Sequence, residues 1–520
     1  MHNRLSTATK ITSVISTDIN EDNPDGVSVP PITPDLLRQP KRSDTSPVLT
    51  RVDDAGKDGH APYRLLNQFM VVIMAGSNGY LWGALTGFTA MGLHSIKTDP
   101  EAPFNVTQEY QSLFGGGGHL GSMAGALTGG FVAELLGRKR VLLLYILVYM
   151  GAWLLIAFPA SLAMFITGRL ITGFVCGTRH VSVYMYVSEC AHPKIRARIG
   201  TSVQCCQMLG VLLNYILGSY LPWRELAIIN ACLPLLLFIA ILFIPESPMW
   251  LIAKGRMEAA RASLQRLRGR DIDVSAEFQD MTSHFQNTKS SLTSWKMIFR
   301  FSYLKPIFLL LIMVILRQFT GFVVILYYAF DIFRESGIGM NPYHGTMILG
   351  SFQFVAYLVG GYIMDRLGRR RAIVVSASVM GVAEFSLAIF YFLKSQDHLE
   401  HLVIFVPWFP LLALMITMIG FSLGAGSIIV ISVGELVPIQ IKNKATGLIN
   451  FFVTGFAFTI LEVFFYMVDA IQFYGTFWVF SCCCFGLALY FHFVMPETKG
   501  ESLSQIERKV TQTNLDSKCS

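Results

Sequence analysis

The chain has 520 residues, of which 53% are hydrophobic and only 14% are charged, and its mean hydropathy is +0.50. Soluble domains average about 25% charged residues, so this composition excludes a series of soluble domains and most soluble enzyme folds. The net charge of +7 is typical of a membrane protein with basic cytoplasmic loops, and we predict no nucleic acid partner.

Residues 1–66 are polar and rich in Ser, Thr, Pro and Asp, and no apolar stretch follows Met1. A secretory signal peptide needs such a stretch. We therefore expect this segment to be a disordered cytoplasmic tail.

Apolar segments long enough to cross ~30 Å of hydrocarbon repeat from Leu66 onward. Six of them predict an N-terminal bundle over residues 67–244, and six more predict a C-terminal bundle over 304–495. The predicted spans are 67–92, 112–136, 140–159, 162–188, 199–220, 225–244, 304–333, 343–364, 371–393, 403–434, 443–468 and 473–495. The sequence thus predicts an all-α membrane protein with twelve transmembrane helices in two six-helix bundles, resting in a lipid bilayer.

Two polar regions complete this layout. Residues 245–303 form a cytoplasmic loop, and 496–520 form a cytoplasmic tail. The loop contains a basic amphipathic pattern over 256–268. This pattern favours a short helix under the bundle, and the alternative is an anchor on the membrane surface.

The short loops on one side carry most of the basic residues, among them Arg138, Arg196, Arg370 and Lys442. Basic loops face the cytoplasm, so we predict that both termini are cytoplasmic and that the protein is a multi-pass protein of the plasma membrane. Asn105 begins a glycosylation sequon in the first outside loop, which agrees with this orientation.

Acidic and basic residues recur at matching places in the two halves. They are Glu134, Arg138, Lys139, Glu189, Arg196 and Glu246 in the first half, and Asp365, Arg369, Arg370, Glu435, Lys442 and Glu497 in the second. This recurrence indicates a duplicated six-helix unit. We predict that these groups form a cytoplasmic charge network that pairs neighbouring helices and biases a two-state equilibrium. The alternative is that they only fix the topology.

The sequence contains no pattern typical of an enzyme. The nine cysteines lie mostly inside apolar runs without metal-ligand spacing, so we interpret them as buried thiols. Residues 246–300 contain no glycine-rich phosphate loop. We predict no catalytic residues, no metal and no cofactor.

Several motifs together resemble the sugar porter family of the major facilitator superfamily, over residues 66–507. They are Gly137-Arg138-Lys139, Gly168-Arg169, Tyr186-Val-Ser-Glu189, Pro245-Glu-Ser-Pro248, Gly368-Arg-Arg370 and Pro496-Glu-Thr-Lys-Gly500. Residues 217–223 resemble the insect facilitated trehalose transporter branch. The resemblance implies a major facilitator fold, in which two bundles rock around a solute site at the membrane midplane.

The resemblance also implies roles for individual residues. Gln204 matches a glutamine that binds sugar hydroxyls, and Gln318 matches one of a glutamine pair. Tyr327 and Tyr328 match a tyrosine pair at the outer gate. A glutamine amide both donates and accepts hydrogen bonds, as a polyol requires, although a lone membrane glutamine more often joins two helices.

The chain departs from the family pattern at several of these positions. The first glutamine of the pair is Arg317, and the family asparagine of the eleventh span falls on Val453, with Asn450 one turn away. Val323 stands where the family pattern has an asparagine, and Tyr184 stands where it has the proline before the tyrosine of the fourth span. In the tenth span, residues 427–430 replace the family's Pro-x-Pro-Trp. Fewer groups are then left to discriminate sugar hydroxyls.

Charged and titratable residues occur within the predicted spans instead, namely Arg179, His180, Arg317 and Glu462. Such residues face a cavity or a partner, because a charge in lipid is costly. One interpretation is that Arg179, His180 or Arg317 binds an anionic solute. The other is a structural ion pair between Arg317 and Glu462.

The first span contains no Asp, Glu or His between Gln68 and Leu93, and Leu85 takes the approximate place of the acid in proton-coupled relatives. We therefore predict facilitative uniport of a small polar solute, with a sugar favoured, by alternating access. The alternatives are an organic anion or proton-coupled transporter, with His180 or Glu462 as the relay, and a non-transporting solute sensor. The sequence indicates no oligomeric state.

Overall fold

The computed structural model describes residues 61–101, 103–104, 107–191, 196–269, 272–289, 301–337, 340–396, 398, 405–426, 428–437 and 442–495. All of them belong to one structural unit, residues 59–520. Within these ranges the chain is largely helical and contains no β-strand. The predicted all-α fold is therefore confirmed.

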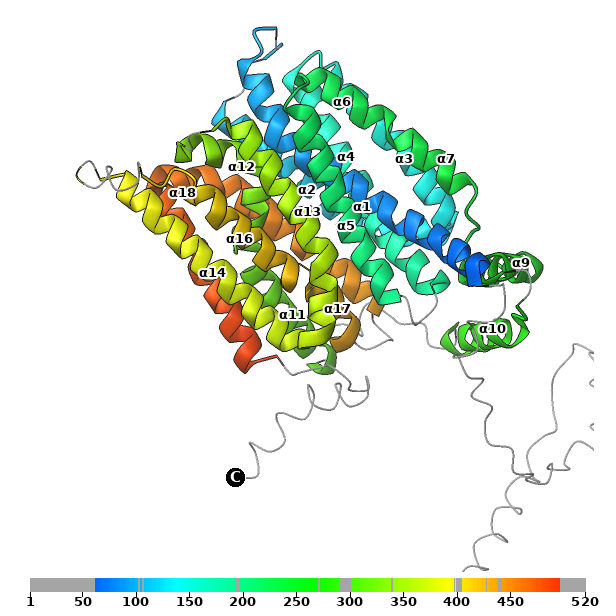
Figure 1. Ribbon diagram of the computed structural model, residues 1–520. Helices are drawn as coiled ribbons and strands as arrows, with labels where there is room; N and C mark the ends of the chain where they lie inside the picture. The colour runs from blue at the N-terminus through cyan, green and yellow to red at the C-terminus, as the bar shows by residue number, and fades with distance from the viewer. Residues whose placement is uncertain are drawn as a thin grey trace, which may run out of the picture. The chain divides into compact units, whose positions relative to one another are not determined.

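Each predicted span falls on one helix or on two consecutive helical segments (Figure 1). The first six spans are α1 (Ala61–Thr98), α2 (Gln108–Leu136), α3 (Arg138–Ala157), α4 (Leu162–Cys190), α5 (Arg196–Gly218), and α6 (Trp223–Cys232) with α7 (Pro234–Leu242). The last six are α11 (Phe301–Gln318) with α12 (Phe322–Ser336), α13 (Pro342–Leu367), α14 (Arg369–Lys394), α16 (Phe409–Leu423) with α17 (Ile428–Leu436), and α18 (Lys442–Phe493), which covers two spans.

Six helical stretches of the described residues are long and apolar enough to cross a membrane. They are Phe69–Thr98, Arg138–Ala157, Trp223–Leu242, Pro306–Ser336, Arg369–Lys394 and Ala445–Phe493. Ser202–Gly218 and Phe409–Leu423 are shorter apolar helices. These lengths agree with a multi-pass membrane protein.

Several spans are interrupted in ways that the apolar pattern does not show. Pro234 begins α7 and lacks the N–H that would continue α6. Gly321 separates α11 from α12 with a φ of 73°, in the region that glycine adopts at little cost. The tenth span is broken between Leu423 and Ile428, and α18 changes direction at Gln472.

Helices pack closely where small residues bring their backbones together. In the first half α1 packs along α5 and α2 along α4, and in the second half α14 packs along α16 and α18. At Gly79 and Gly83 of α1, the carbonyl oxygens of Val203 and Gln207 on α5 occupy the space that a side chain would need. The halves meet where α2 contacts α18, α5 contacts α13 and α1 contacts α12.

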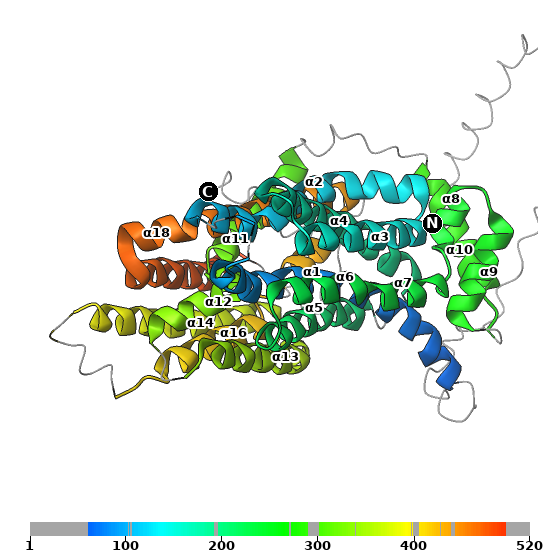
Figure 2. The same cartoon turned by 90° about the horizontal axis from the view of Figure 1, so that it is seen from above.

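The central loop forms α8 (Pro248–Ala253), α9 (Met257–Arg268) and α10 (Ser275–Lys289). They lie at the end of the bundle where α1 begins (Figure 2). The apolar face of α9 buries Ala260, Leu264 and Leu267, and α9 contacts α1 and α8. Because that face is covered by protein, the structure favours a helix packed under the bundle over a membrane-surface anchor.

Candidate functional site

Helix α12 joins the two halves at the predicted outer end, which is the end where α1 finishes and α2 begins. Thr86 Oγ1 of α1 donates a hydrogen bond to the Tyr327 hydroxyl over 3.2 Å, and the Tyr215 hydroxyl of α5 donates to the Leu326 carbonyl over 2.6 Å. At Tyr328 the α12 backbone leaves the helical region. The predicted outer-gate tyrosines thus lie in a contact layer between the halves.

Further contacts extend this layer toward the outer end. The His94 ring lies 4.1 Å from the Phe330 ring. Lys97 donates a hydrogen bond to Gln111, and the Gln111 amide donates to the Asp331 carboxylate over 3.4 Å. These contacts link α1 and α2 to α12, so this end of the protein is closed.

The end of α1 is also fixed to the beginning of α6. The Trp223 indole N–H donates a hydrogen bond to the Asp99 carboxylate over 2.8 Å. This hydrogen bond, with a second from the backbone N–H of Glu101, holds the pKa of the Asp99 carboxyl below its usual range. The predicted motif at residues 217–223 therefore stabilises the first half at its outer end.

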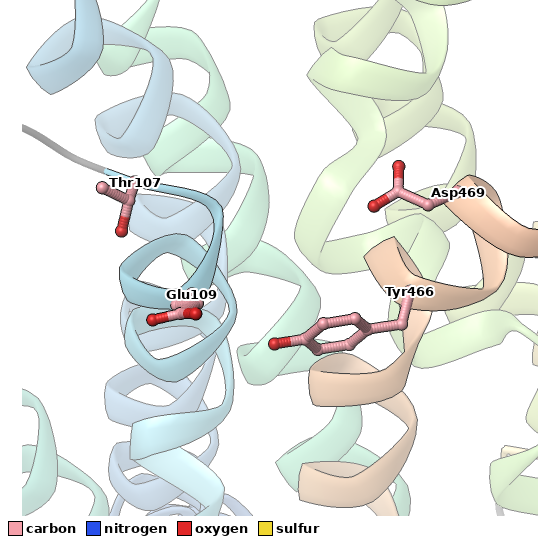
Figure 3. A pocket seen from close by; sticks show the side chains of 4 residues that line it. All are labelled: Thr107, Glu109, Tyr466 and Asp469. Carbon is pink, nitrogen blue, oxygen red and sulfur yellow. The ribbon is translucent and has the colours of Figure 1, made fainter.

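A small cavity of about 350 Å³ opens beside this layer, lined by Thr107, Glu109, Tyr466 and Asp469. Figure 3 shows Tyr466 reaching from α18 toward Glu109 at the start of α2. The described lining residues include two carboxylates, Glu109 and Asp469, whose negative charge disfavours anions. This cavity lies between α2 and α18, outside the predicted midplane site.

Two of the predicted solute-binding amides are available to a ligand. Gln204 lies on α5 and Asn450 on α18, and both are partly exposed. Within the described ranges neither side-chain amide has a hydrogen-bond partner. An amide that is partly buried without a partner gains from binding a hydroxyl group.

Arg317 has a different role from the two that the sequence suggests. Its Nε donates to the Ala425 carbonyl over 2.9 Å and one terminal nitrogen to the Gly426 carbonyl over 3.4 Å. Its guanidinium lies 5.0 Å from the centre of the Phe421 ring. These carbonyls lack helical hydrogen-bond partners because the tenth span is broken after α16, and Arg317 satisfies them. The predicted ion pair with Glu462 is not formed.

The Gln318 side-chain amide, unlike that of Gln204, already has hydrogen-bond partners within the protein. Its amide donates to the Val453 carbonyl over 2.8 Å and accepts a hydrogen bond from Arg317 over 2.6 Å. Glu462 instead lies beside Gly116 of α2. In this conformation Gln318 therefore joins α11 to α18, as a lone membrane glutamine more often does.

Arg179 is fully buried inside the first half. It donates hydrogen bonds to Ser77 Oγ of α1 over 2.9 Å and to the Leu142 carbonyl of α3. This placement argues against the predicted contact with an anionic solute. His180 is partly exposed, and its ring lies 4.6 Å from the Tyr184 ring on the same helix.

The first-half members of the predicted charge network lie together. Arg138 forms an ion pair with Glu189 over 2.8 Å, and both side chains are largely buried. Glu189 also accepts a hydrogen bond from Ser247. Glu246 accepts one from the backbone N–H of Lys139 over 3.0 Å. This part of the network joins α3, α4 and the loop before α8.

Three of the remaining members, Glu134, Arg369 and Arg370, have described side chains. The Glu134 side chain is exposed, and Arg369 is partly exposed. Arg370 donates hydrogen bonds to the Phe491 and His492 carbonyls at the end of α18. Outside the described side chains lie Arg196, Asp365, Glu435, Lys442, Glu497 and the sequon residue Asn105.

Sequence reasoning missed two aromatic residues beside Tyr327, of which His119 contacts the Tyr327 ring and Trp82 contacts His119. The Trp82 ring of α1 lies 5.2 Å from the His119 ring of α2. The His119 ring lies 5.3 Å from the Tyr327 ring. His119 follows four consecutive glycines, and this is the signal that could have indicated a closely packed position.

Comparisons with known proteins agree with this architecture. The family model described as "Sugar (and other) transporter" matches residues 68–510. The facilitated trehalose transporter Tret1 of Apis mellifera ligustica is 31% identical over 451 residues, which cover 86% of this chain and 89% of the relative. Tret1 of Bombyx mori is 30% identical over 480 residues, covering 90% and 92%.

Solved structures of the major facilitator superfamily share the fold. The proton:xylose symporter XylE bound to 6-bromo-6-deoxy-D-glucose has a TM-score of 0.70 and 21% identity, covering 86% of this chain and 99% of that one. The inward open conformation of XylE from E. coli has a TM-score of 0.68 and 21% identity, covering 85% and 99%. The predicted major facilitator fold is therefore confirmed.

Proposed function

The chain belongs to the sugar transporter family, and on this premise we propose that it is a uniporter that carries a neutral sugar by alternating access. The substrate and the mode of transport are both parts of this proposal. Trehalose is the first sugar to test, because the relatives are named for it.

One observation supports uniport above the others. Arg169 of α4 is fully buried, and it donates hydrogen bonds to the Leu85 and Phe114 carbonyls over 3.1 and 3.3 Å and to Thr89 Oγ1. None of these acceptors takes up or releases a proton near neutral pH. A proton-coupled carrier needs a titratable group in its cycle, and Leu85 of α1 supplies only a backbone oxygen here.

The disposition of the arginines supports a neutral solute over an anion. Arg169, Arg179 and Arg317 donate to neutral oxygens of the protein, and Arg169 and Arg179 are fully buried, so these two are not presented to a solute in this conformation. The amides of Gln204 and Asn450, both predicted site groups, have no hydrogen-bond partner in the described ranges. Amides suit hydroxyl groups better than they suit carboxylates.

Alternating access requires that the contact layer at the outer end can open. The hydrogen bonds of Tyr215 and Tyr327 in this layer are uncharged and contribute about 1 kcal/mol each. Two conformations separated by a few kcal/mol interconvert when a ligand binds them differently. We further propose that both termini are cytoplasmic and that the protein resides in the plasma membrane, as the distribution of basic loops supports.

Uptake by the purified protein in liposomes tests the proposal. Trehalose and glucose would be compared with small carboxylates, with and without a pH gradient, and empty liposomes would serve as the control. We expect sugar to equilibrate without accumulation and to be indifferent to the gradient. Accumulation driven by the gradient would make the protein a proton-coupled transporter. Carboxylate uptake would make it an anion transporter, and binding without uptake would indicate a solute sensor.

A further inference from the structure

His119 of α2 is a buried polar side chain without a partner. Its side chain is among the buried polar groups, with 5% of the residue exposed. Neither Nδ1 nor Nε2 has a hydrogen-bond partner among the described residues. A neutral imidazole carries one donor and one acceptor, and leaving both unmade in a buried position is unfavourable. A group that binds at this point recovers both interactions.

The packing of α2 fixes His119 at this place. Gly115 to Gly118 precede it, and their missing side chains let α2 approach its neighbours closely. A side chain at Gly118 would clash with Leu85 of α1, and one at Gly115 would clash with the Tyr328 hydroxyl of α12. The imidazole is therefore held where α1 and α2 of the first half meet α12 of the second.

The aromatic neighbours of His119 pack against its ring without hydrogen-bonding its nitrogens. Trp82 packs against the imidazole at an interplanar angle of 70°. The indole is partly exposed although Leu81 and Gly83, its neighbours in sequence, are buried. The Tyr327 ring lies 5.3 Å from the imidazole, and its hydroxyl already accepts a hydrogen bond from Thr86. Neither aromatic neighbour therefore supplies a hydrogen bond to the imidazole.

Aromatic packing alone does not require a histidine here. A phenylalanine would make the same ring contacts with Trp82 and Tyr327 and would leave no polar atom unpaired. An imidazole with two unused nitrogens is unfavourable in the empty protein and becomes favourable only with a hydrogen-bonding ligand.

We propose that His119 is a solute-binding residue that hydrogen-bonds a hydroxyl group of a neutral polyhydroxylated solute, with Trp82 as the adjacent apolar wall. This inference rests on the proposed function and adds a polar contact from α2 to the site. The neutral ring donates to one hydroxyl oxygen or accepts from one hydroxyl proton, so it recognises a single hydroxyl position on the sugar.

The test compares wild type with His119→Phe, His119→Gln and His119→Ala in liposomes. The probes are whichever of trehalose and glucose the wild type transports, with its monodeoxy derivatives as competitors. In the wild type, removing one particular hydroxyl should weaken competition roughly tenfold, as expected for the loss of one hydrogen bond. His119→Phe should bind the parent sugar about tenfold more weakly and should no longer distinguish that deoxy analogue. His119→Gln should restore part of the discrimination.

Three results would overturn the inference. The first is a His119→Phe carrier with wild-type affinity and the same hydroxyl dependence. The second is an equal loss for every analogue. The third is a wild-type profile in which no single hydroxyl matters. If the wild-type protein neither binds nor transports a sugar, the proposed function itself fails. The two failures are therefore distinguishable.

The choice of variant and a second assay separate loss of binding from misfolding. His119→Phe preserves the ring contacts. The shift of the thermal midpoint on adding sugar to detergent-purified protein reports binding without transport. In the wild type, the analogue that lacks the recognised hydroxyl should give a smaller midpoint shift than the parent sugar. In His119→Phe this difference should disappear, and its persistence contradicts the inference. His344→Ala, at an exposed histidine near the start of α13, is the matched control and should behave as wild type.

Discussion

Replacing Arg317 with glutamine restores the residue of the family pattern and removes a cation from the break in the tenth span. In the structure the guanidinium reaches the Ala425 and Gly426 carbonyls and lies over the Phe421 ring. It also donates to Gln318, whose amide holds Val453 of α18. A glutamine side chain is shorter and reaches fewer of these groups, so Arg317→Gln should destabilise the second half.

The magnitude follows from the contacts that are lost. A hydrogen bond from a charged donor contributes about 1.5–3 kcal/mol, and a cation–π contact contributes about 0.5–2 kcal/mol. These terms are not additive, and glutamine replaces part of them, so we expect a loss of roughly 3–5 kcal/mol in the free energy of unfolding. For a chain of this size the thermal midpoint should then fall by roughly 3–5 °C.

Thermal unfolding of detergent-purified protein measures this shift, with the remaining monodisperse fraction followed by gel filtration. The matched control is Arg334→Gln, because Arg334 is half-exposed and pairs with Asp331 over 3.4 Å. An exposed ion pair contributes about 0–1 kcal/mol, so the control should shift the midpoint little. If Arg317→Gln unfolds at the wild-type temperature but loses solute uptake, the structural interpretation is wrong and Arg317 binds the solute.

Three further predictions concern the site, the contact layer and the charge network. Gln204→Ala should weaken sugar uptake with intact expression, and unchanged uptake would remove Gln204 from the site. Tyr215→Phe removes one hydrogen bond between the halves and should favour opening of the outer end roughly fivefold. A cysteine introduced by Phe330→Cys reports this opening through its rate of labelling by an external thiol reagent. An unchanged labelling rate contradicts the prediction. A double-mutant cycle on Arg138 and Glu189 should give a coupling energy of roughly 1–3 kcal/mol in thermal unfolding, and additive single effects would show that the ion pair is incidental.

The helices of this fold could be predicted from the sequence because a membrane imposes a minimum apolar length. The breaks within the spans could not be. Gly321 and Pro234 are visible in the sequence, but glycine and proline are also common in unbroken membrane helices. Whether a helix ends at such a residue depends on how neighbouring helices pack against it. At Gly321, for example, Phe480 of α18 fills the space that a side chain would occupy.

The chemistry of the site was less predictable, for a related reason. A charge in an apolar span indicates either a ligand or an ion pair, and both were considered for Arg317. The structure shows a third arrangement, in which backbone carbonyls that a helix break leaves without helical partners accept the hydrogen bonds of Arg317. Sequence periodicity does not reveal which carbonyls are free. His119 was missed because a lone histidine in a glycine-rich span is usually a packed residue.

The buried arginines also bear on how the two halves move. Arg169 and its acceptors on α1 and α2 all belong to the first half, and Arg317 and its acceptors after α16 all belong to the second. A rocking motion of one half against the other therefore leaves these contacts intact. Such a motion breaks the uncharged hydrogen bonds of Tyr327 and Tyr215 and the hydrogen bond from Gln111 to Asp331. Because Arg169 and Arg317 keep their hydrogen-bond partners, the proposed cycle does not expose either buried cation without a partner, which agrees with uniport.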